Sequence, residues 1–110
     1  MINKKIILFG IIILILGCQN QNYDSFAKCL TEKGAVMYGA YWCGHCKEQK
    51  EMFGDSFKYI NYVECTEKKQ ICEDAGIGGY PTWIIDGKEY KGIQPLYKLS
   101  GLTECEIEPF

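Results

Sequence analysis

Hydrophobic and polar residues follow two different periods along this chain, and the changes of period mark the predicted elements. Residues 35–40 and 59–65 are runs of apolar and β-branched side chains typical of strands. Residues 83–85 and 88–91 flank Asp86-Gly87, a dipeptide typical of tight hairpins. Good helix formers occupy residues 26–33, 47–53, 68–75 and 94–99. We expect Asp24 or Ser25 to cap the first helix, Pro95 to lie near the start of the last, and Gly34, Gly54, Gly76 and Gly101 to end the four helices.

The order of these elements predicts the fold class. It runs helix, strand, helix, strand, helix, strand, strand, helix. A βαβ unit followed by a ββα unit gives a mixed four-stranded sheet flanked by helices, which is an α/β fold. A chain of 110 residues has room for one such domain, which we place at residues 26–110.

The N-terminal segment has the pattern of a targeting signal. Lys4 and Lys5 precede an apolar run over residues 6–16, which is too short to span a bilayer alone. The run ends in Ile15-Leu16-Gly17-Cys18, which resembles the lipobox of bacterial lipoproteins. The resemblance implies cleavage after residues 1–17, a lipid on Cys18 and a tether over residues 18–25. An uncleaved membrane anchor and simple secretion are the alternatives, and all three place the domain outside the cytoplasm.

Composition and charge exclude one class of partner. Twelve lysines, no arginine and 14 acidic residues give a net charge of −2, so we expect no binding to nucleic acid. Eight tyrosines, five phenylalanines and two tryptophans suffice for a small dense core. We expect Tyr38, Phe53, Tyr59 and Tyr62 to belong to that core, and we expect a monomer.

The candidate chemistry lies in Cys43-Gly44-His45-Cys46, between a predicted strand and a predicted helix. At the first turn of that helix, free backbone N–H groups and the helix dipole favour a thiolate at Cys43. A protonated His45 would stabilise the thiolate further. Cys46 lies one helical turn deeper, placed to attack a mixed disulfide formed at Cys43. A purely structural disulfide and half of a metal site are the alternative interpretations.

These features together resemble the thioredoxin superfamily, through the element order, the C-x-x-C motif and Tyr80-Pro81-Thr82. The closer similarity is to the thioredoxin-like domain associated with vitamin K epoxide reductase homologues of bacteria and plants. It is carried by Gly34-Ala35, Met37–Cys43, His45-Cys46, Gln49-Lys50, Phe53-Gly54, Ile60–Cys65 and Gly79–Trp83. The Cys-Gly-His-Cys motif is the one seen in protein disulfide isomerase. The resemblance implies that Pro81 is cis and faces the cysteines, that Tyr80 pairs with an extended substrate, and that Trp42 lies partly exposed beside Cys43.

Two departures from the family pattern stand out. Protein disulfide isomerase has a buried acid six residues before its first active-site cysteine, where this sequence has Met37. Either Cys46 loses its proton more slowly as a result, or another group such as Glu64 relays the proton in place of that acid. The sequence also contains no membrane reductase domain, so a quinone-linked partner of the vitamin K epoxide reductase type would act in trans.

The remaining cysteines suggest structural disulfides. The chain has seven cysteines, and six remain once Cys18 is set aside for lipid. The related fused domains imply a pair between Cys65 and Cys72. Cys29 and Cys105 are then left to pair across a long loop, with a free Cys105 in a mobile tail as the rival. The six-residue gap between Cys65 and Cys72 is unlike a zinc knuckle, so we expect no metal and no cofactor.

The sequence therefore predicts a membrane-tethered thiol–disulfide oxidoreductase outside the cytoplasm. It would oxidise or isomerise disulfides of secreted proteins and be reoxidised by a membrane quinone-linked partner. Two other functions fit the same residues: a reductase that keeps extracytoplasmic thiols reduced, and a non-enzymatic adaptor that holds unfolded chains in the groove at Tyr80-Pro81.

Overall fold

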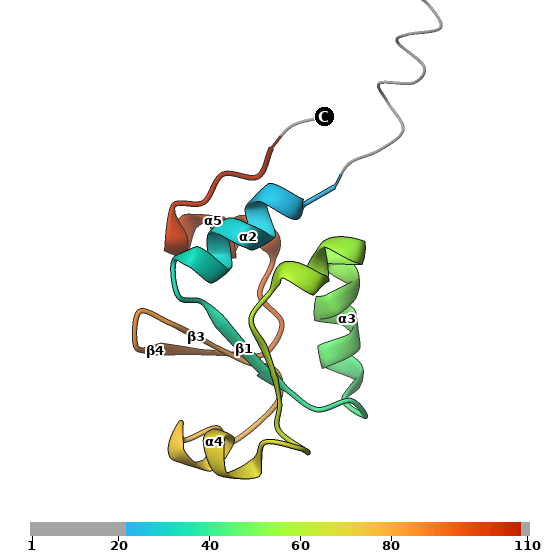
Figure 1. The fold of residues 1–110 in the computed structure, drawn as a ribbon, viewed down its shortest axis with the longest axis vertical. Helices are drawn as coiled ribbons and strands as arrows, with labels where there is room; N and C mark the ends of the chain where they lie inside the picture. Colours follow the sequence, from blue (N-terminus) through green and yellow to red (C-terminus); the bar gives the residue numbers. More distant parts are fainter. Residues whose placement is uncertain (1–21, 109–110) are drawn as a thin grey trace, which may run out of the picture.

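The computed structural model describes residues 22–108 and arranges them as helices around one sheet (Figure 1). The elements in chain order are α2 (Asp24–Glu32), β1 (Val36–Gly39), α3 (Gly44–Phe53), the 3-10 helix η1 (Gly54–Tyr59), β2 (Tyr62–Glu64), α4 (Lys69–Asp74), β3 (Thr82–Ile85), β4 (Lys88–Lys91) and α5 (Leu96–Thr103).

The sheet has four strands in the order β2-β1-β3-β4. β1 pairs in parallel with β2, with Met37 opposite Tyr62, and antiparallel with β3, with Met37 opposite Trp83. β3 and β4 form the hairpin expected at Asp86-Gly87, where both residues have positive φ, 52° and 76°. The prediction of a mixed four-stranded sheet built from βαβ and ββα units is confirmed.

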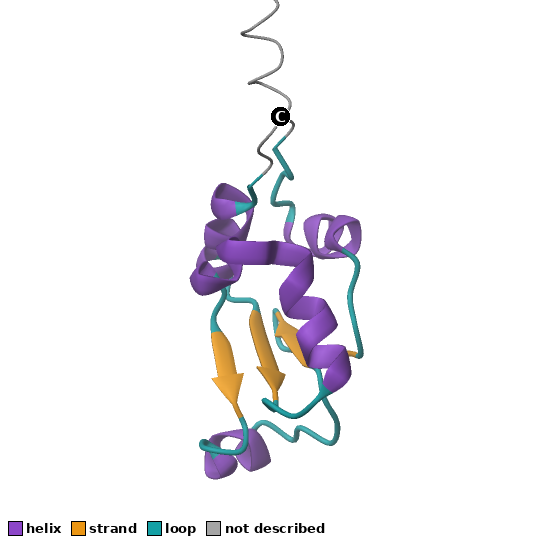
Figure 2. Cartoon of the chain, turned by 90° about the vertical axis from the view of Figure 1, so that its right-hand side faces the viewer, coloured by secondary structure: helices purple, strands orange, loops and turns teal. Residues whose placement is uncertain are grey.

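The helices are distributed over one face and the two ends of the sheet. Figure 2 shows α3 lying against the strands, while α2 and α5 gather at one end and α4 lies at the other. The largest fully buried side chains include Trp83, Phe26, Phe53, Leu30, Met37 and Leu99. The ring of Phe53 lies 6.0 Å from that of Phe26 and 6.3 Å from that of Trp83, so it joins α2, α3 and β3 in one core.

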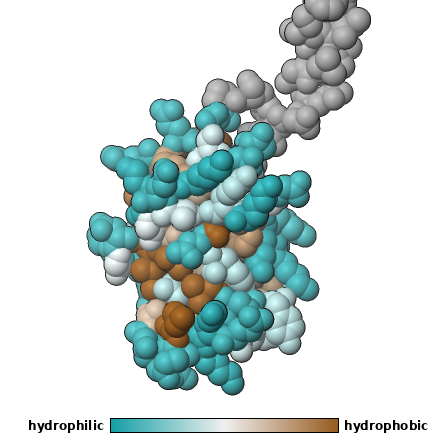
Figure 3. Space-filling model, viewed as in Figure 1, coloured by the Kyte–Doolittle hydropathy of each residue, from teal (hydrophilic) through white to brown (hydrophobic). Residues whose placement is uncertain are grey.

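The opposite face of the sheet is less covered. Val36, Tyr38 and Ile84 alternate with fully buried strand residues and are only half-buried. Figure 3 shows apolar surface on the side of the molecule away from α3. Tyr59 and Tyr62 are also half-buried, so of the four aromatic residues expected in the core only Phe53 is fully enclosed.

The first helix begins earlier than the sequence predicts. α2 starts at Asp24, its N-cap residue is Tyr23, and no side chain caps it. The hydroxyl of Ser56 instead accepts the N–H of Tyr23 at 2.9 Å and donates to the Asp24 carboxylate at 2.6 Å. The expectation of a cap at Asp24 or Ser25 is therefore wrong. The Asn22 side chain accepts the N–H of Asp24 at 3.1 Å, and Ser56 binds Tyr23 and Asp24 from a distant part of the chain. The tether expected over residues 18–25 overlaps the helix at its last two residues.

The second strand is shorter than expected. Residues 54–59 form η1, which continues α3 as a tighter helix, and the strand starts only at Tyr62. Phe57, in η1, packs against both Phe53 and Tyr62, with ring centroids 6.0 Å and 5.6 Å away. This aromatic packing holds η1 against α3, and residues 59–61 of the predicted strand are not part of β2.

The last helix continues through Gly101 to Thr103 and ends in Glu104, whose φ is 64°. Gly101 was expected to end it. The buried Leu99 and Thr103 lie on one face of the helix, and the Thr103 hydroxyl donates to the Leu99 carbonyl at 2.7 Å. Burial of that face compensates for the poor helix propensity of one exposed glycine.

Several predictions concern the N-terminal segment. The signal segment at residues 1–17 and the lipid site Cys18 lie outside the described residues. None of the helices within residues 22–108 has the length and apolar character needed to cross a bilayer.

Candidate active site

The site begins where β1 gives way to α3. Cys43 is the N-cap residue of α3, with φ −81° and ψ 119°, and its sulfur accepts the N–H of Cys46 at 3.1 Å. Its carbonyl accepts the N–H of Lys47 at 3.1 Å and so begins the helical ladder. The sulfur thus replaces the oxygen of an ordinary N-cap side chain at the positive end of a ten-residue helix. Cys43 is 7% exposed, whereas Cys46 is 0% exposed.

Cys46 lies one turn into α3, and its side chain is completely buried. Both cysteines are free thiols in this structure. Burial, followed by the contact with the Cys43 thiol, raises the pKa of Cys46 to about 12. Cys46 is therefore a protected thiol that meets other molecules only through Cys43.

A cis peptide bond joins Tyr80 to Pro81, directly beside the cysteines. The Cys43 thiol lies 3.7 Å from the carbonyl oxygen of Tyr80 and donates to it. Trp42 is 60% exposed and meets the Tyr80 ring edge-on, with centroids 5.8 Å apart. Trp42 and Tyr80 therefore border Cys43 with an aromatic surface, which an extended peptide could contact.

His45 is exposed and lies beside Glu48. Its Nδ1 lies 3.5 Å from the carboxylate of Glu48, and both side chains are more than 60% exposed, at 73% and 61%. Within the described residues, no hydrogen bond joins His45 to Cys43. The predicted role of His45 as a partner of the Cys43 thiolate therefore depends on its charge acting through solvent, where it is screened.

Comparisons with known proteins agree with this geometry. A thioredoxin family model matches residues 15–104. The chain belongs to the thioredoxin family. It is 48% identical over 93 residues to thiol-disulfide oxidoreductase LTO1 of Arabidopsis thaliana, covering 76% of this chain and 25% of that protein. It is 40% identical over 90 residues to protein disulfide isomerase-like 2-2 of Oryza sativa subsp. japonica, covering 68% of this chain and 24% of that protein.

The similarity covers one domain of larger proteins. The chain spans about a quarter of the length of the curated relatives it matches. Among solved structures, the N21Q mutant thioredoxin from Halobacterium salinarum aligns with a TM-score of 0.50 at 18% identity, covering 82% of this chain and 89% of that one. At that identity the likeness concerns the fold alone.

Four other cysteines of this thioredoxin-family domain form two disulfides. Cys29 in α2 is bonded to Cys105, just after α5, across a sequence separation of 76 residues. Cys65, which follows β2, is bonded to Cys72 in α4, across seven residues. Cys105 is bonded to Cys29 and is 1% exposed. The alternative of a free Cys105 in a mobile tail is therefore wrong.

A buried polar cluster that the sequence did not single out fixes α3 against the sheet. Gln49 lies three residues after Cys46 and is 0% exposed. Its side-chain oxygen accepts from the indole N–H of Trp83 at 3.0 Å and from the backbone N–H of Gln94 at 2.7 Å, and its amide donates to the Gln94 carbonyl at 3.0 Å. The sequence signal is a glutamine on the face of α3 that also carries Cys46 and Phe53.

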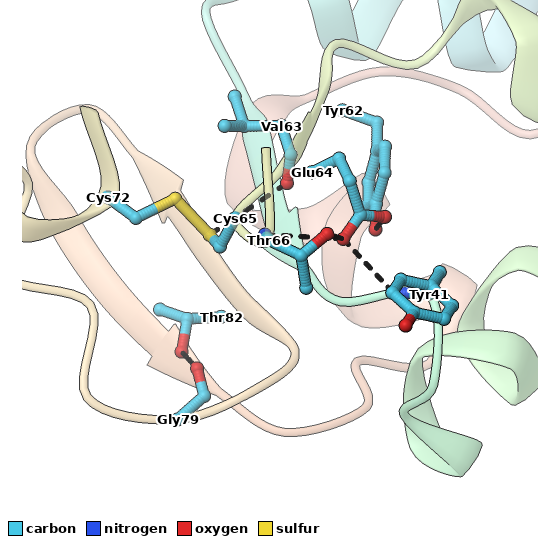
Figure 4. Close-up of a disulfide and its surroundings, with 9 residues drawn as sticks. All are labelled: Tyr41, Tyr62, Val63, Glu64, Cys65, Thr66, Cys72, Gly79 and Thr82. Atoms are coloured by element: carbon cyan, nitrogen blue, oxygen red, sulfur yellow. Dashed lines mark hydrogen bonds between the residues drawn. A yellow bond between two sulfur atoms is a disulfide. The ribbon is translucent and has the colours of Figure 1, made fainter. Parts of the chain in front are cut away.

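Glu64 lies at the end of β2, beside the loop that leads to Cys43. Its carboxylate accepts the N–H of Tyr41 at 3.1 Å, the Thr66 hydroxyl at 2.7 Å and the Tyr62 hydroxyl at 2.8 Å (Figure 4). Burial acts to raise the pKa of Glu64, but the hydrogen bonds from Thr66, Tyr62 and Tyr41 outweigh it and lower that pKa. Met37, where the family pattern has an acid, is fully buried in β1.

Proposed function

We propose that this chain is a thiol–disulfide oxidoreductase that acts outside the cytoplasm on disulfides of secreted proteins. The observation that supports this proposal is that its two thiols differ in position and in enclosure. Cys43 caps α3 and borders an exposed aromatic surface, while Cys46 is enclosed one turn behind it. Such a pair exchanges disulfides through one accessible nucleophile and one resolving thiol.

The chemistry follows from these positions. In the reducing direction the Cys43 thiolate attacks a substrate disulfide, one substrate sulfur leaves as a thiolate, and a mixed disulfide forms at Cys43. Cys46 then attacks the Cys43 sulfur, releasing the second substrate thiolate and leaving the Cys43–Cys46 disulfide. Two electrons pass from the cysteine pair to the substrate. In the oxidising direction the same steps run in reverse, and an isomerase uses both.

The compartment is proposed from the other cysteines and from the N-terminal pattern. Disulfides such as Cys29–Cys105 and Cys65–Cys72 persist where the environment is oxidising. The lipobox-like Ile15-Leu16-Gly17-Cys18 would tether the domain to a membrane through lipid on Cys18. Reoxidation by a membrane quinone-linked partner of the vitamin K epoxide reductase type is proposed from the sequence resemblance to domains associated with such reductases.

Trapping tests activity, location and partner together. Cys46→Ala removes the resolving thiol, so covalent complexes through Cys43 should accumulate in cells and disappear with dithiothreitol. The matched control is the double variant Cys43→Ala, Cys46→Ala, which should trap nothing. Mass spectrometry of the membrane fraction should identify secreted substrates and an integral membrane oxidoreductase. Partners found only in the cytoplasm would overturn the location, and the absence of any complex through Cys43 would favour an adaptor.

The direction of electron flow has its own measurement. Thiolate stabilisation at the N-terminus of α3 stabilises the reduced pair and so favours an oxidant. Equilibration of the Cys43–Cys46 pair with glutathione buffers should give a potential above that of thioredoxin, about −270 mV. A potential at or below that value would indicate a reductase fed by a membrane electron donor.

A further inference from the structure

Cys46 must lose a proton at a buried position, away from bulk water. Its side chain is 0% exposed, and burial and the Cys43 contact raise its pKa to about 12. At such a pKa the thiolate is a small minority at neutral pH. Since the thiolate is the attacking form, resolution of a mixed disulfide needs a proton acceptor close to Cys46.

Tyr62 shares a small space with Cys46 beside Gly39 of β1. A Cβ placed on Gly39 would lie 3.0 Å from the Cys46 sulfur and 3.2 Å from the Tyr62 hydroxyl oxygen. Glycine at this position therefore leaves the two groups facing the same gap, which any larger residue would fill. The next inward-facing residue of β1, Met37, offers no titratable group.

The Tyr62 hydroxyl is already connected to a carboxylate. It donates to Glu64 Oε1 at 2.8 Å, while Glu64 Oε2 is held by the N–H of Tyr41 and the hydroxyl of Thr66 (Figure 4). These bonds lower the pKa of Glu64 against the effect of burial, so the carboxylate is ionised at neutral pH. Glu64 is only half-buried and can exchange protons with solvent.

The groups around Tyr62 keep its hydroxyl protonated, so this residue can pass a proton on but does not lose one for good. Burial and the bond to Glu64 raise the pKa of Tyr62, so it does not itself become a phenolate. Lys50 lies over its ring, with Nζ 4.2 Å from the centroid, and the Lys50 charge acts to lower the pKa of Cys46. Tyr62 can therefore pass a proton to Glu64 only while it takes one from elsewhere. The titratable groups that act on Cys46 and Tyr62 are Cys43, Lys50 and Glu64.

We propose that Tyr62 and Glu64 form the proton relay of Cys46. As the Cys46 sulfur bonds to the Cys43 sulfur and the bond from Cys43 to substrate breaks, the Cys46 proton passes to the Tyr62 oxygen, directly or through one water. The Tyr62 proton moves to Glu64, which releases it to solvent, and the substrate leaves as a thiolate. When the pair is reduced by a thiol, a proton returns to Cys46 along the same path in reverse. The relay rests on the thiol–disulfide chemistry proposed above, and Glu64 acts only through Tyr62.

Separate measurement of the two chemical steps tests the relay. The full chain with Cys18→Ser, in detergent, is reduced at Cys43 and Cys46 and mixed with glutathione disulfide. Acid quenching and intact mass give the rate at which glutathione appears on Cys43 and the rate at which it is released by Cys46. We expect Tyr62→Phe and Glu64→Gln to slow release at least tenfold and to leave appearance within twofold.

Two further measurements separate a relay from a structural role. The double variant Tyr62→Phe, Glu64→Gln should release glutathione no more slowly than the slower single variant, because both substitutions break one path. Formate should restore part of the release rate in Glu64→Ala, since a small carboxylate can take the place of the missing acceptor. Tyr59→Phe, at a half-buried position of η1, and Glu67→Gln, at an exposed position, are the matched controls and should change neither step.

Each result of these measurements has a different consequence for the relay and for the oxidoreductase function. Unchanged release in Tyr62→Phe and Glu64→Gln would overturn the relay and leave the oxidoreductase function standing. Equal slowing of both steps would also overturn it, because the site as a whole would then be disturbed. Failure of the unsubstituted pair to form any mixed disulfide would overturn the oxidoreductase function itself.

Discussion

The backbone N–H of Cys46 donates a hydrogen bond to the sulfur of Cys43 at 3.1 Å, so the first thiol of the pair caps the helix that carries the second. A negatively charged sulfur is a better acceptor for this bond than a neutral one. Cys43 thus lies among the free N–H groups of the helix N-terminus, while burial raises the pKa of Cys46. Two cysteines three residues apart thus acquire different roles.

The first prediction concerns stability at alkaline pH. The Cys46 pKa is raised in the folded state from about 9.0 to about 12, so the unfolded chain loses this proton first. The stabilising contribution is complete below pH 9 and is lost as pH rises toward 12, by roughly 1.4 kcal/mol per pH unit. Guanidinium unfolding at pH 8 and pH 10 should show the reduced form losing more stability than the oxidised form, in which Cys46 has no proton to lose.

The control for this prediction is the reduced Cys46→Ala variant. It should lose no more stability between pH 8 and pH 10 than the oxidised protein does. All three samples contain the same tyrosines, and the main causes of the raised pKa of Tyr62, burial and the bond to Glu64, are common to them. If the stability of the reduced and oxidised forms of the unsubstituted protein fell in parallel, Cys46 would not be an enclosed neutral thiol.

The two structural disulfides should differ in their contribution to stability. The chain-entropy model gives about 4.5 kcal/mol for Cys29–Cys105 and about 2.5 kcal/mol for Cys65–Cys72, because the first closes a loop of 76 residues and the second a loop of seven. Denaturant unfolding of the paired serine variants measures both. The Cys65→Ser, Cys72→Ser variant should melt at lower temperature while Cys43 still reacts with substrate. Intact stability with lost turnover at the membrane partner would instead make this pair an electron relay.

Gln49→Leu should destabilise the domain by about 2–4 kcal/mol. Leucine keeps much of the volume but leaves the indole N–H of Trp83 and the N–H of Gln94 buried without an acceptor. Lys47→Leu, at an exposed position of the same helix, is the control and should stay within about 0.5 kcal/mol. Equal unfolding free energies for the two variants would mean that this polar cluster does not hold α3.

His45→Leu should make the cysteine pair a weaker oxidant, because it removes from the neighbourhood of Cys43 a side chain that can carry a positive charge. The shift should be small, roughly 10–30 mV, since His45 is exposed and lies against Glu48 and not against Cys43. Glu48→Gln is the comparison and should shift the potential less. Equilibration with glutathione measures both, and an unchanged potential in His45→Leu would remove His45 from the mechanism.

The local sequence was sufficient to predict most of the fold. Alternating runs, helix formers and the Asp86-Gly87 turn predicted the strands, the helices and their order, because each depends on contacts a few residues apart. Cys43-Gly44-His45-Cys46 likewise predicted a cysteine at the start of a helix. The errors occur where distant residues decide: Ser56 moves the start of α2, and packing of Phe57 against Phe53 and Tyr62 shortens β2.

The sequence by itself determined that two cysteines lie one helical turn apart at the end of a strand. Only the tertiary structure decided which contacts these cysteines make: the Tyr80 carbonyl lies against the Cys43 thiol, and Cys46 is enclosed. The cis Tyr80–Pro81 bond and the Cys29–Cys105 pair, which the sequence had suggested, are present in the structure. The structure also brings Tyr62 and Glu64 to the gap at Gly39, because parallel pairing with β1 sets the register of β2. Strand register and loop closure depend on residues far apart in the chain, and a linear pattern contains no record of which distant residues meet.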